Sequence, residues 1–168
     1  MAAQLAGWKR KMDNNLKLIK TVGGVHIYAA EDHSYVRFVS DLDVCNDGSG
    51  GKHGDKHFQP RTAYYNKGKF LNAHVDAYMV IPISLRKMLQ KKVMGCRAQV
   101  SNIESGQPVE AVCGETGPDN KTGEAAYCLA KQLNPKVTHN SGDKRRIYLY
   151  ELWPGTPATV GGKRYQLE

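Results

Sequence analysis

Short strand-like segments separated by glycine- and proline-containing turns constrain the fold of this chain more than any other feature. They alternate apolar and polar residues or are rich in β-branched residues, and they lie at residues 25–28, 35–39, 41–45, 75–81, 93–100, 108–113 and 146–153. Apolar residues have clear helical spacing in two other segments, residues 5–19 and 124–133. The sequence therefore predicts a mainly β fold with few helices, arranged as a barrel or a sandwich.

The length of the chain predicts a single domain over residues 1–168. Apolar residues from Leu5 to Ile19 recur at spacings of three and four, so we expect residues 1–22 to form an N-terminal amphipathic helix. The β domain is expected over residues 23–168. No apolar run is long enough to span a membrane, and the N-terminal segment lacks the apolar core of a secretory signal.

The charge of the chain is strongly positive, with 24 Lys and Arg against 16 Asp and Glu, a formal net charge of +8. Such a protein concentrates anionic partners near its surface. A nucleic-acid-binding module would also need exposed aromatic residues among the basic ones, or a known motif, and the sequence has neither. We therefore expect no nucleic-acid partner.

Two glutamates flank a predicted turn between a strand and a helix. Glu115 follows the strand, Gly117 and Pro118 mark the turn, and Glu124 opens the helix. Hydrolysis of a glycosidic bond needs such a pair, one carboxylic acid to protonate the leaving oxygen and one carboxylate to activate water or attack. Glutamate in a first helical turn is also common for structural reasons, because it complements the helix dipole.

The helix dipole would lower the pKa of Glu124, whereas a general acid needs a raised pKa. Burial or a neighbouring ionised carboxylate would have to outweigh the dipole. Glu115 is one candidate neighbour, and Asp41 and Asp43 are others because they point the same way from one predicted strand.

The segments around these carboxylates resemble the glycoside hydrolase family 75 chitosanases. Residues 114–118 and 123–130, Gly-Glu-Thr-Gly-Pro and Gly-Glu-Ala-Ala-Tyr-Cys-Leu-Ala, are similar to the family signature G-D-x-G-P…G-E-x-S-x-x-L-A. Further similar segments follow the family order at residues 41–48, 58–62, 71–73, 78–82 and 153–155. The resemblance covers about residues 38–157 and implies an enzyme that cleaves β-1,4 bonds in an amino-sugar polymer.

The same core segment is similar to the pattern of rare lipoprotein A, a peptidoglycan lytic transglycosylase with a double-psi β-barrel fold. Expansins and family 45 endoglucanases share that barrel. The resemblance implies a six-stranded double-psi barrel with Glu124 as the general acid and Glu115 as the second carboxylate. Asp41 and Asp43 are further candidate catalytic residues. Glu115 stands where family 75 has Asp, which extends the carboxylate by one methylene group.

The resemblance and the aromatic content point to candidate substrate-binding residues: Gln59, Thr62, Tyr78, Tyr127 and Trp153. His53, Asp55 and His57 are metal-type ligands, but they alternate on one glycine-rich loop without a fourth ligand, and the four cysteines lack zinc-site spacing. We therefore expect neither a metal nor another cofactor.

These observations predict a glycosidase that acts on chitosan or peptidoglycan, with a cell-wall glycan as its partner. Chitosan is a polycation, so a protein of charge +8 would be repelled by it unless its groove is locally acidic. The alternative is a non-catalytic polysaccharide-binding or virion structural module that keeps the barrel. We expect synthesis in the cytoplasm without a signal peptide, and action on the cell wall after release or delivery, as for a phage lysin or a delivered effector.

Overall fold

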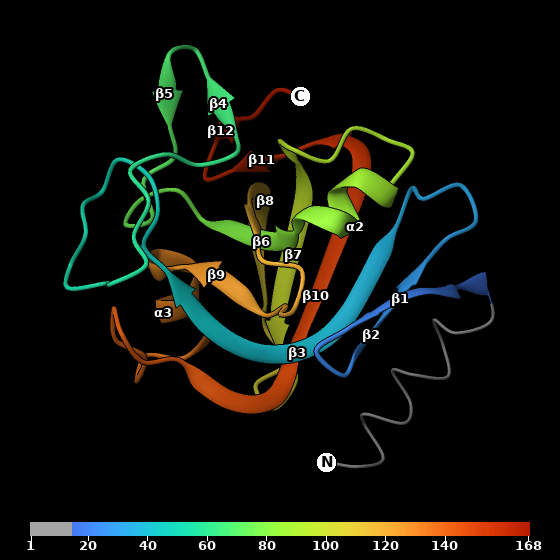
Figure 1. The fold of residues 1–168 in the computed structure, drawn as a ribbon, viewed down its shortest axis with the longest axis horizontal. Coiled ribbons are helices and arrows are strands. Elements are labelled where there is room, and N and C mark those ends of the chain that lie inside the picture. Colours follow the sequence, from blue (N-terminus) through green and yellow to red (C-terminus); the bar gives the residue numbers. More distant parts are fainter. Residues whose placement is uncertain (1–14) are drawn as a thin grey trace.

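The computed structural model describes residues 15–168 and consists mainly of strands (Figure 1). The strands are β1 (Lys17–Val22), β2 (Val25–Ala29), β3 (Val36–Cys45), β4 (Tyr65–Asn66), β5 (Lys69–Phe70), β6 (Tyr78–Pro82), β7 (Cys96–Asn102), β8 (Pro108–Gly117), β9 (Glu124–Ala126), β10 (Asp143–Pro157), β11 (Thr159–Val160) and β12 (Lys163–Arg164). The helices are α2 (Ile83–Met88) and α3 (Tyr127–Leu133). The described part contains no helix that is both long and apolar enough to cross a membrane.

Six strands close into a barrel in the order β3-β10-β7-β8-β6-β9, and β9 pairs back onto β3 (Figure 1). The β6–β8 and β3–β9 pairs are parallel, and the other four are antiparallel. The six strands form two halves in chain order, β3-β6-β7 and β8-β9-β10. If each strand is exchanged with the corresponding strand of the other half, the pattern of neighbours stays the same. The barrel thus has the pseudo-twofold, interlocked order of the double-psi type, which confirms the predicted fold.

Aromatic and β-branched side chains fill the barrel. Phe38 and Tyr150 are register partners on β3 and β10, and their rings stack with centroids 5.0 Å apart. The Tyr150 hydroxyl donates a hydrogen bond to the Asp41 carbonyl oxygen at 2.9 Å, which satisfies the polar end of a fully buried ring. A packed interior leaves no room for a substrate, so a binding site must lie on the outside of the barrel.

The N-terminal prediction is wrong where the structure tests it. Residues 17–22 form strand β1, because Gly23 and Gly24 adopt left-handed backbone angles and Val22 pairs with Val25 in a tight hairpin. Residues 1–14, which hold the rest of the expected helix, lie outside the described residues. The predicted helix 124–133 is also shorter than expected, since Glu124–Ala126 is strand β9 and the helix begins at Tyr127.

A long connection follows β3 (Figure 1). Gly48 fixes the start of this connection. Gly48 forms an isolated antiparallel bridge with Asn72, and its amide donates to the Gln59 carbonyl oxygen at 2.8 Å. Its φ is +102°, and a Cβ placed there would lie 1.9 Å from the Leu71 carbonyl oxygen. Only glycine fits this crossing of two backbones.

We expect Gly48→Ala to destabilise the protein much more than Gly106→Ala. Both glycines have positive φ angles, +102° and +73°, but a Cβ at Gly106 meets nothing within 4 Å. The strained φ alone costs about 1 kcal/mol, and the Gly48 variant must also move backbone away from the Leu71 oxygen. Urea unfolding of both variants measures the difference, and equal losses would show that the close contact at Gly48 has no effect on stability.

Candidate functional site

Four side chains form a row across four neighbouring strands on the outside of the barrel. Val80 on β6 is the register partner of Glu115 on β8 and of Glu124 on β9, and Glu124 is in turn the partner of Asp43 on β3. Partners in register point to the same side of a sheet. The two glutamates are thus two strands apart, with backbones separated by about 9.5 Å.

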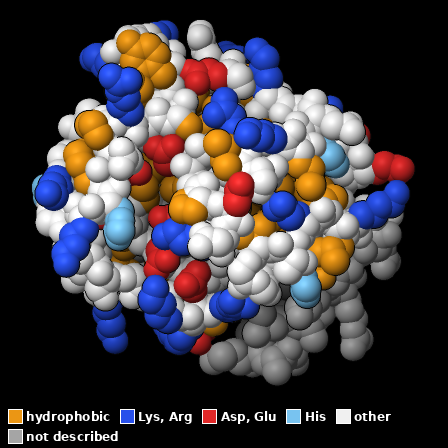
Figure 2. Space-filling view, in the orientation of Figure 1, with side chains coloured by type: hydrophobic (Ala, Val, Ile, Leu, Met, Phe, Trp, Pro, Cys, Tyr) orange, Lys and Arg blue, Asp and Glu red, His pale blue; other side chains and the backbone are white. Residues whose placement is uncertain are grey.

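Val80, Glu115 and Glu124 of this row line a cleft of about 590 Å³. One wall is the connection after β3, and the opposite wall is the turn after β8; the lining includes Asp47, Gln59, Glu115, Pro118, Lys121 and Glu124. Figure 2 shows acidic side chains gathered around a hollow in this face, with lysines and arginines around it. The cleft therefore brings together Glu115 and Glu124, the two glutamates predicted from the sequence.

Glu115 is almost completely buried, with 7% of its surface exposed. Its Oε1 accepts hydrogen bonds from the amides of Ala63 at 3.0 Å and Thr116 at 2.7 Å. Burial raises the pKa of Glu115 to about 7 against the opposing effect of these amides, and the charges of Asp47 and Glu124 raise it further. At neutral pH this side chain can hold a proton and release it.

The negative charge of Glu124 is better compensated than that of Glu115, because a basic side chain lies beside it. Its Oε1 lies 3.0 Å from Lys121 Nζ, and 16% of its side chain is exposed. Burial raises its pKa, Lys121 opposes that shift, and Asp43 and Asp47 add to it. The conflict with the helix dipole does not arise, because Glu124 lies in β9 and the helix begins three residues later. Gly117 gives it room, since a Cβ there would lie 2.9 Å from Glu124 Oε2.

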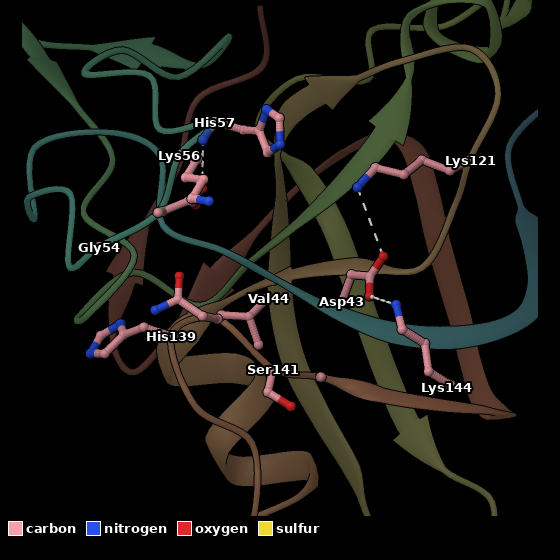
Figure 3. Close-up of a pocket in the computed structure, with 12 residues that line it drawn as sticks. Asp43, Val44, Gly54, Lys56, His57, Lys121, His139, Ser141 and Lys144 are labelled. Carbon is pink, nitrogen blue, oxygen red and sulfur yellow. Dashed lines mark hydrogen bonds and ion pairs between the residues drawn. The ribbon is translucent and has the colours of Figure 1, made fainter.

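Asp43 and Asp41 differ in position although they are two residues apart on β3. Asp43 lies in a second pocket of about 580 Å³ that adjoins the cleft and shares Lys121 with it. It forms ion pairs with Lys144 at 2.9 Å and Lys121 at 3.8 Å (Figure 3). Asp41 lines neither pocket, and its Oδ1 accepts a hydrogen bond from Ser40 Oγ at 3.1 Å. The cleft and this second pocket together form one groove. Asp43 is part of that groove, and Asp41 is not.

Asp47 also lines the cleft, although it is not among the candidate catalytic residues. Burial raises its pKa, and the amide of Gln59, which donates to Oδ1 at 2.6 Å, opposes the rise. Its backbone oxygen accepts a hydrogen bond from the Tyr78 hydroxyl at 2.8 Å. The sequence places Asp47 in a turn-like cluster, and only the folding of the connection against the barrel brings it near the glutamates.

The five candidate substrate-binding residues fall into different places. Gln59 lines the cleft and is exposed, whereas Tyr78 is buried in the core beneath it. Thr62 is buried and hydrogen-bonded to the backbone of Tyr64 and Leu71, so it braces the connection. Tyr127 stacks on the His139 ring instead of facing the cleft.

Trp153, the fifth candidate, lies outside both pockets. Its ring stacks under the guanidinium group of Arg97, with 4.2 Å between the Arg97 Cζ and the ring centroid. Of these five residues, only Gln59 lines the cleft.

No protein-family model matches the chain, and no curated protein matches it. The site itself holds two carboxylates in an open cleft: Glu115 is almost completely buried and has a raised pKa, and Glu124 is partly buried beside Lys121.

The pH dependence of stability tests the environment of Glu115. Its pKa is near 7 in the folded protein, against an ordinary value of 4.5. Between pH 4.5 and 7 the folded protein therefore holds a proton that the unfolded chain has lost. The free energy of unfolding should fall as the pH rises from about 4.5 to about 7, by on the order of 3 kcal/mol from this group. Glu115→Gln should remove that part of the slope in melts recorded across this range.

The matched control is Glu110→Gln, on the same strand. Glu110 is exposed and pairs with Arg97 at 3.1 Å, so Glu110→Gln removes a carboxylate from β8 and leaves the surroundings of Glu115, and its part of the slope, in place. A Glu115→Gln protein with the wild-type slope would show that Glu115 titrates as an ordinary glutamate.

Proposed function

We propose that the protein is a glycoside hydrolase that cleaves β-1,4 bonds in an amino-sugar polymer. The observation that carries this proposal is the pair of Glu115 and Glu124, which face one open cleft from strands two apart and differ in environment. Two carboxylates in different environments are what glycosidic hydrolysis requires, because one must be protonated while the other is ionised. The resemblance to the family 75 chitosanases includes the same two residues and supports the same activity.

In this proposal Glu115 is the general acid and Glu124 is the general base. This assignment reverses the roles that the family resemblance suggests. Burial raises the pKa of Glu115 to about 7, and no basic side chain of the described residues forms an ion pair with it, so it can hold the proton that the leaving oxygen needs. Glu124 is paired with Lys121, which favours its ionised form.

The spacing of the two glutamates favours inversion at the anomeric carbon. Carboxyl groups of retaining enzymes are about 5–5.5 Å apart, close to the spacing of adjacent strands, whereas those of inverting enzymes are about 6.5–9.5 Å apart. Val80 stands between Glu115 and Glu124 in the row. In an inverting reaction, Glu124 would activate a water molecule on the face of the sugar opposite Glu115.

The charge of the groove favours a substrate with free amino groups. Five carboxylates and three lysines line the two adjoining pockets: Asp43, Asp47, Asp55, Glu115, Glu124, Lys56, Lys121 and Lys144. With Glu115 protonated, four carboxylates face three lysines, so the groove keeps a small acidic excess although the whole chain carries +8. A local excess of carboxylates attracts protonated amino sugars at short range, which removes the objection that net charge raises against chitosan.

We expect the wild-type protein to release reducing ends from chitosan, and from purified peptidoglycan more slowly. Glu115→Gln and Glu124→Gln should each lower the rate at least about a hundredfold, because acid–base catalysis contributes about 10²–10⁴-fold. The rate should decline as the pH rises above about 7, where Glu115 loses its proton. Proton NMR of the first products should show the inverted, α, anomer.

Glu110→Gln is the control for activity as well, because it removes a carboxylate from β8 outside the cleft. Binding of either polymer without release of reducing ends would contradict the proposal and favour the non-catalytic polysaccharide-binding module. Near-native turnover by the Glu124→Gln protein would also contradict it.

A further inference from the structure

Three histidines from separate parts of the chain meet beside the groove. His53 comes from the connection after β3, His74 from the segment between β5 and β6, and His139 from the segment between α3 and β10. One ligand nitrogen of each lies within 4.8 Å of those of the other two. In Figure 3, His139 lies across the second pocket from Asp43 and its two lysines. The cluster is therefore at one end of the groove and apart from the glutamates.

Hydrogen bonds fix the His139 ring from behind. The buried amide of Asn46 donates through Nδ2 to Asp55 Oδ2 at 3.1 Å and to the His139 carbonyl oxygen at 2.9 Å, so its Oδ1 is the acceptor. That oxygen lies 2.9 Å from His139 Nδ1, which places the proton on Nδ1 and leaves a lone pair on Nε2. Tyr127 stacks on the ring at 3.8 Å. An oxygen that holds the far nitrogen of an imidazole is the usual outer partner of a metal-ligating histidine.

The other two rings also have a nitrogen free to bind a metal ion. His53 Nε2 lies 3.0 Å from the Gly50 carbonyl oxygen, so Nε2 donates and Nδ1 keeps its lone pair. His74 Nε2 is buried and has no hydrogen-bond partner in the described chain. A buried polar atom without a partner is costly, and a ligand on it relieves that cost.

We propose that His53, His74 and His139 bind one Zn²⁺ ion and leave its fourth position open to water. Imidazole nitrogen is a preferred ligand of Zn²⁺, and three such ligands with an open position form a known type of zinc site. Tetrahedral ligands at about 2.0–2.1 Å from zinc are about 3.3 Å apart. The His53 ring stacks on the His139 ring with centroids 4.3 Å apart, so the site closes when His53 turns out of that stack. His53 is exposed and can make most of that adjustment.

Such an ion would join the connection after β3 to the barrel. That connection carries Asp47, Asp55 and Gln59 into the cleft, so zinc would hold one wall of the groove in place. This role in the groove rests on the proposed glycosidase function, whereas the binding of zinc does not. The zinc site also changes the interpretation of the glycine-rich loop. In the structure, His74 and His139 replace Asp55 and His57 as the metal-type ligands beside His53.

The test uses the full chain, stripped of metal with a chelator, and Zn²⁺ alone as the probe. Isothermal titration should give one ion per chain, and Zn²⁺ should raise the Tm by several degrees, because a ligand that binds only the folded state stabilises it. Co²⁺ in place of Zn²⁺ should give the visible absorption of a four-coordinate site.

His53→Ala and His74→Ala should each weaken Zn²⁺ binding at least about a hundredfold, more than the loss of an outer-shell partner. His53 is exposed, so its variant should fold normally even if the His74 variant does not. The matched control is His26→Ala on β2, an exposed histidine 2.9 Å from Thr21 Oγ1, and it should bind like the wild type.

Absence of binding to the wild type, or equal binding by the wild type and His53→Ala, would overturn the zinc site. The measurements contain no polysaccharide, so their failure would leave the glycosidase proposal intact. Conversely, a protein that binds zinc and does not cleave glycans would contradict only the proposed function.

Discussion

Strand β9 is the element on which the rest of this structure depends. It has three residues, Glu124–Ala126, and it pairs with β3 on one side and β6 on the other. Without these two pairings the sheet would be open between β3 and β6. The same pairings set Glu124 in register with Asp43 and with Val80. Val80 is in turn the register partner of Glu115, so the two glutamates lie in one row. Closure of the barrel and assembly of the carboxylate pair are therefore one event.

The fold was largely predictable because its strands have strong local signals. The alternation in residues 35–45 and 146–153, and the apolar run that ends at Pro82, correspond to β3, β10 and β6. The short elements were not predictable in the same way. Strand β9 precedes a helix directly, and its alanines fit a helical pattern equally well, so tertiary pairing decides its conformation. The hairpin that makes residues 17–22 a strand depends on Gly23 and Gly24.

The candidate site was partly predictable for a related reason. Glu115 and Glu124 flank one turn, so the sequence alone brings them close together. Asp47 and His139 come from separate connections, and no spacing in the sequence indicates that they approach the groove. Thr62 and Tyr78 fit a binding motif in the sequence, but their side chains brace the backbone around the cleft. The sequence pattern thus marks the neighbourhood of the site and does not separate lining residues from supporting ones.

A crystal structure of the Glu115→Gln protein with a chitosan oligosaccharide tests the central claim most directly. The substitution keeps the shape of the side chain and removes the proton that cleavage needs, so the intact oligosaccharide should stay in the cleft. The account predicts that a glycosidic oxygen lies within hydrogen-bond distance of residue 115, with a water molecule between Glu124 and the anomeric carbon. An oligosaccharide bound elsewhere, or in the cleft with its glycosidic oxygens away from both residues, would contradict the account.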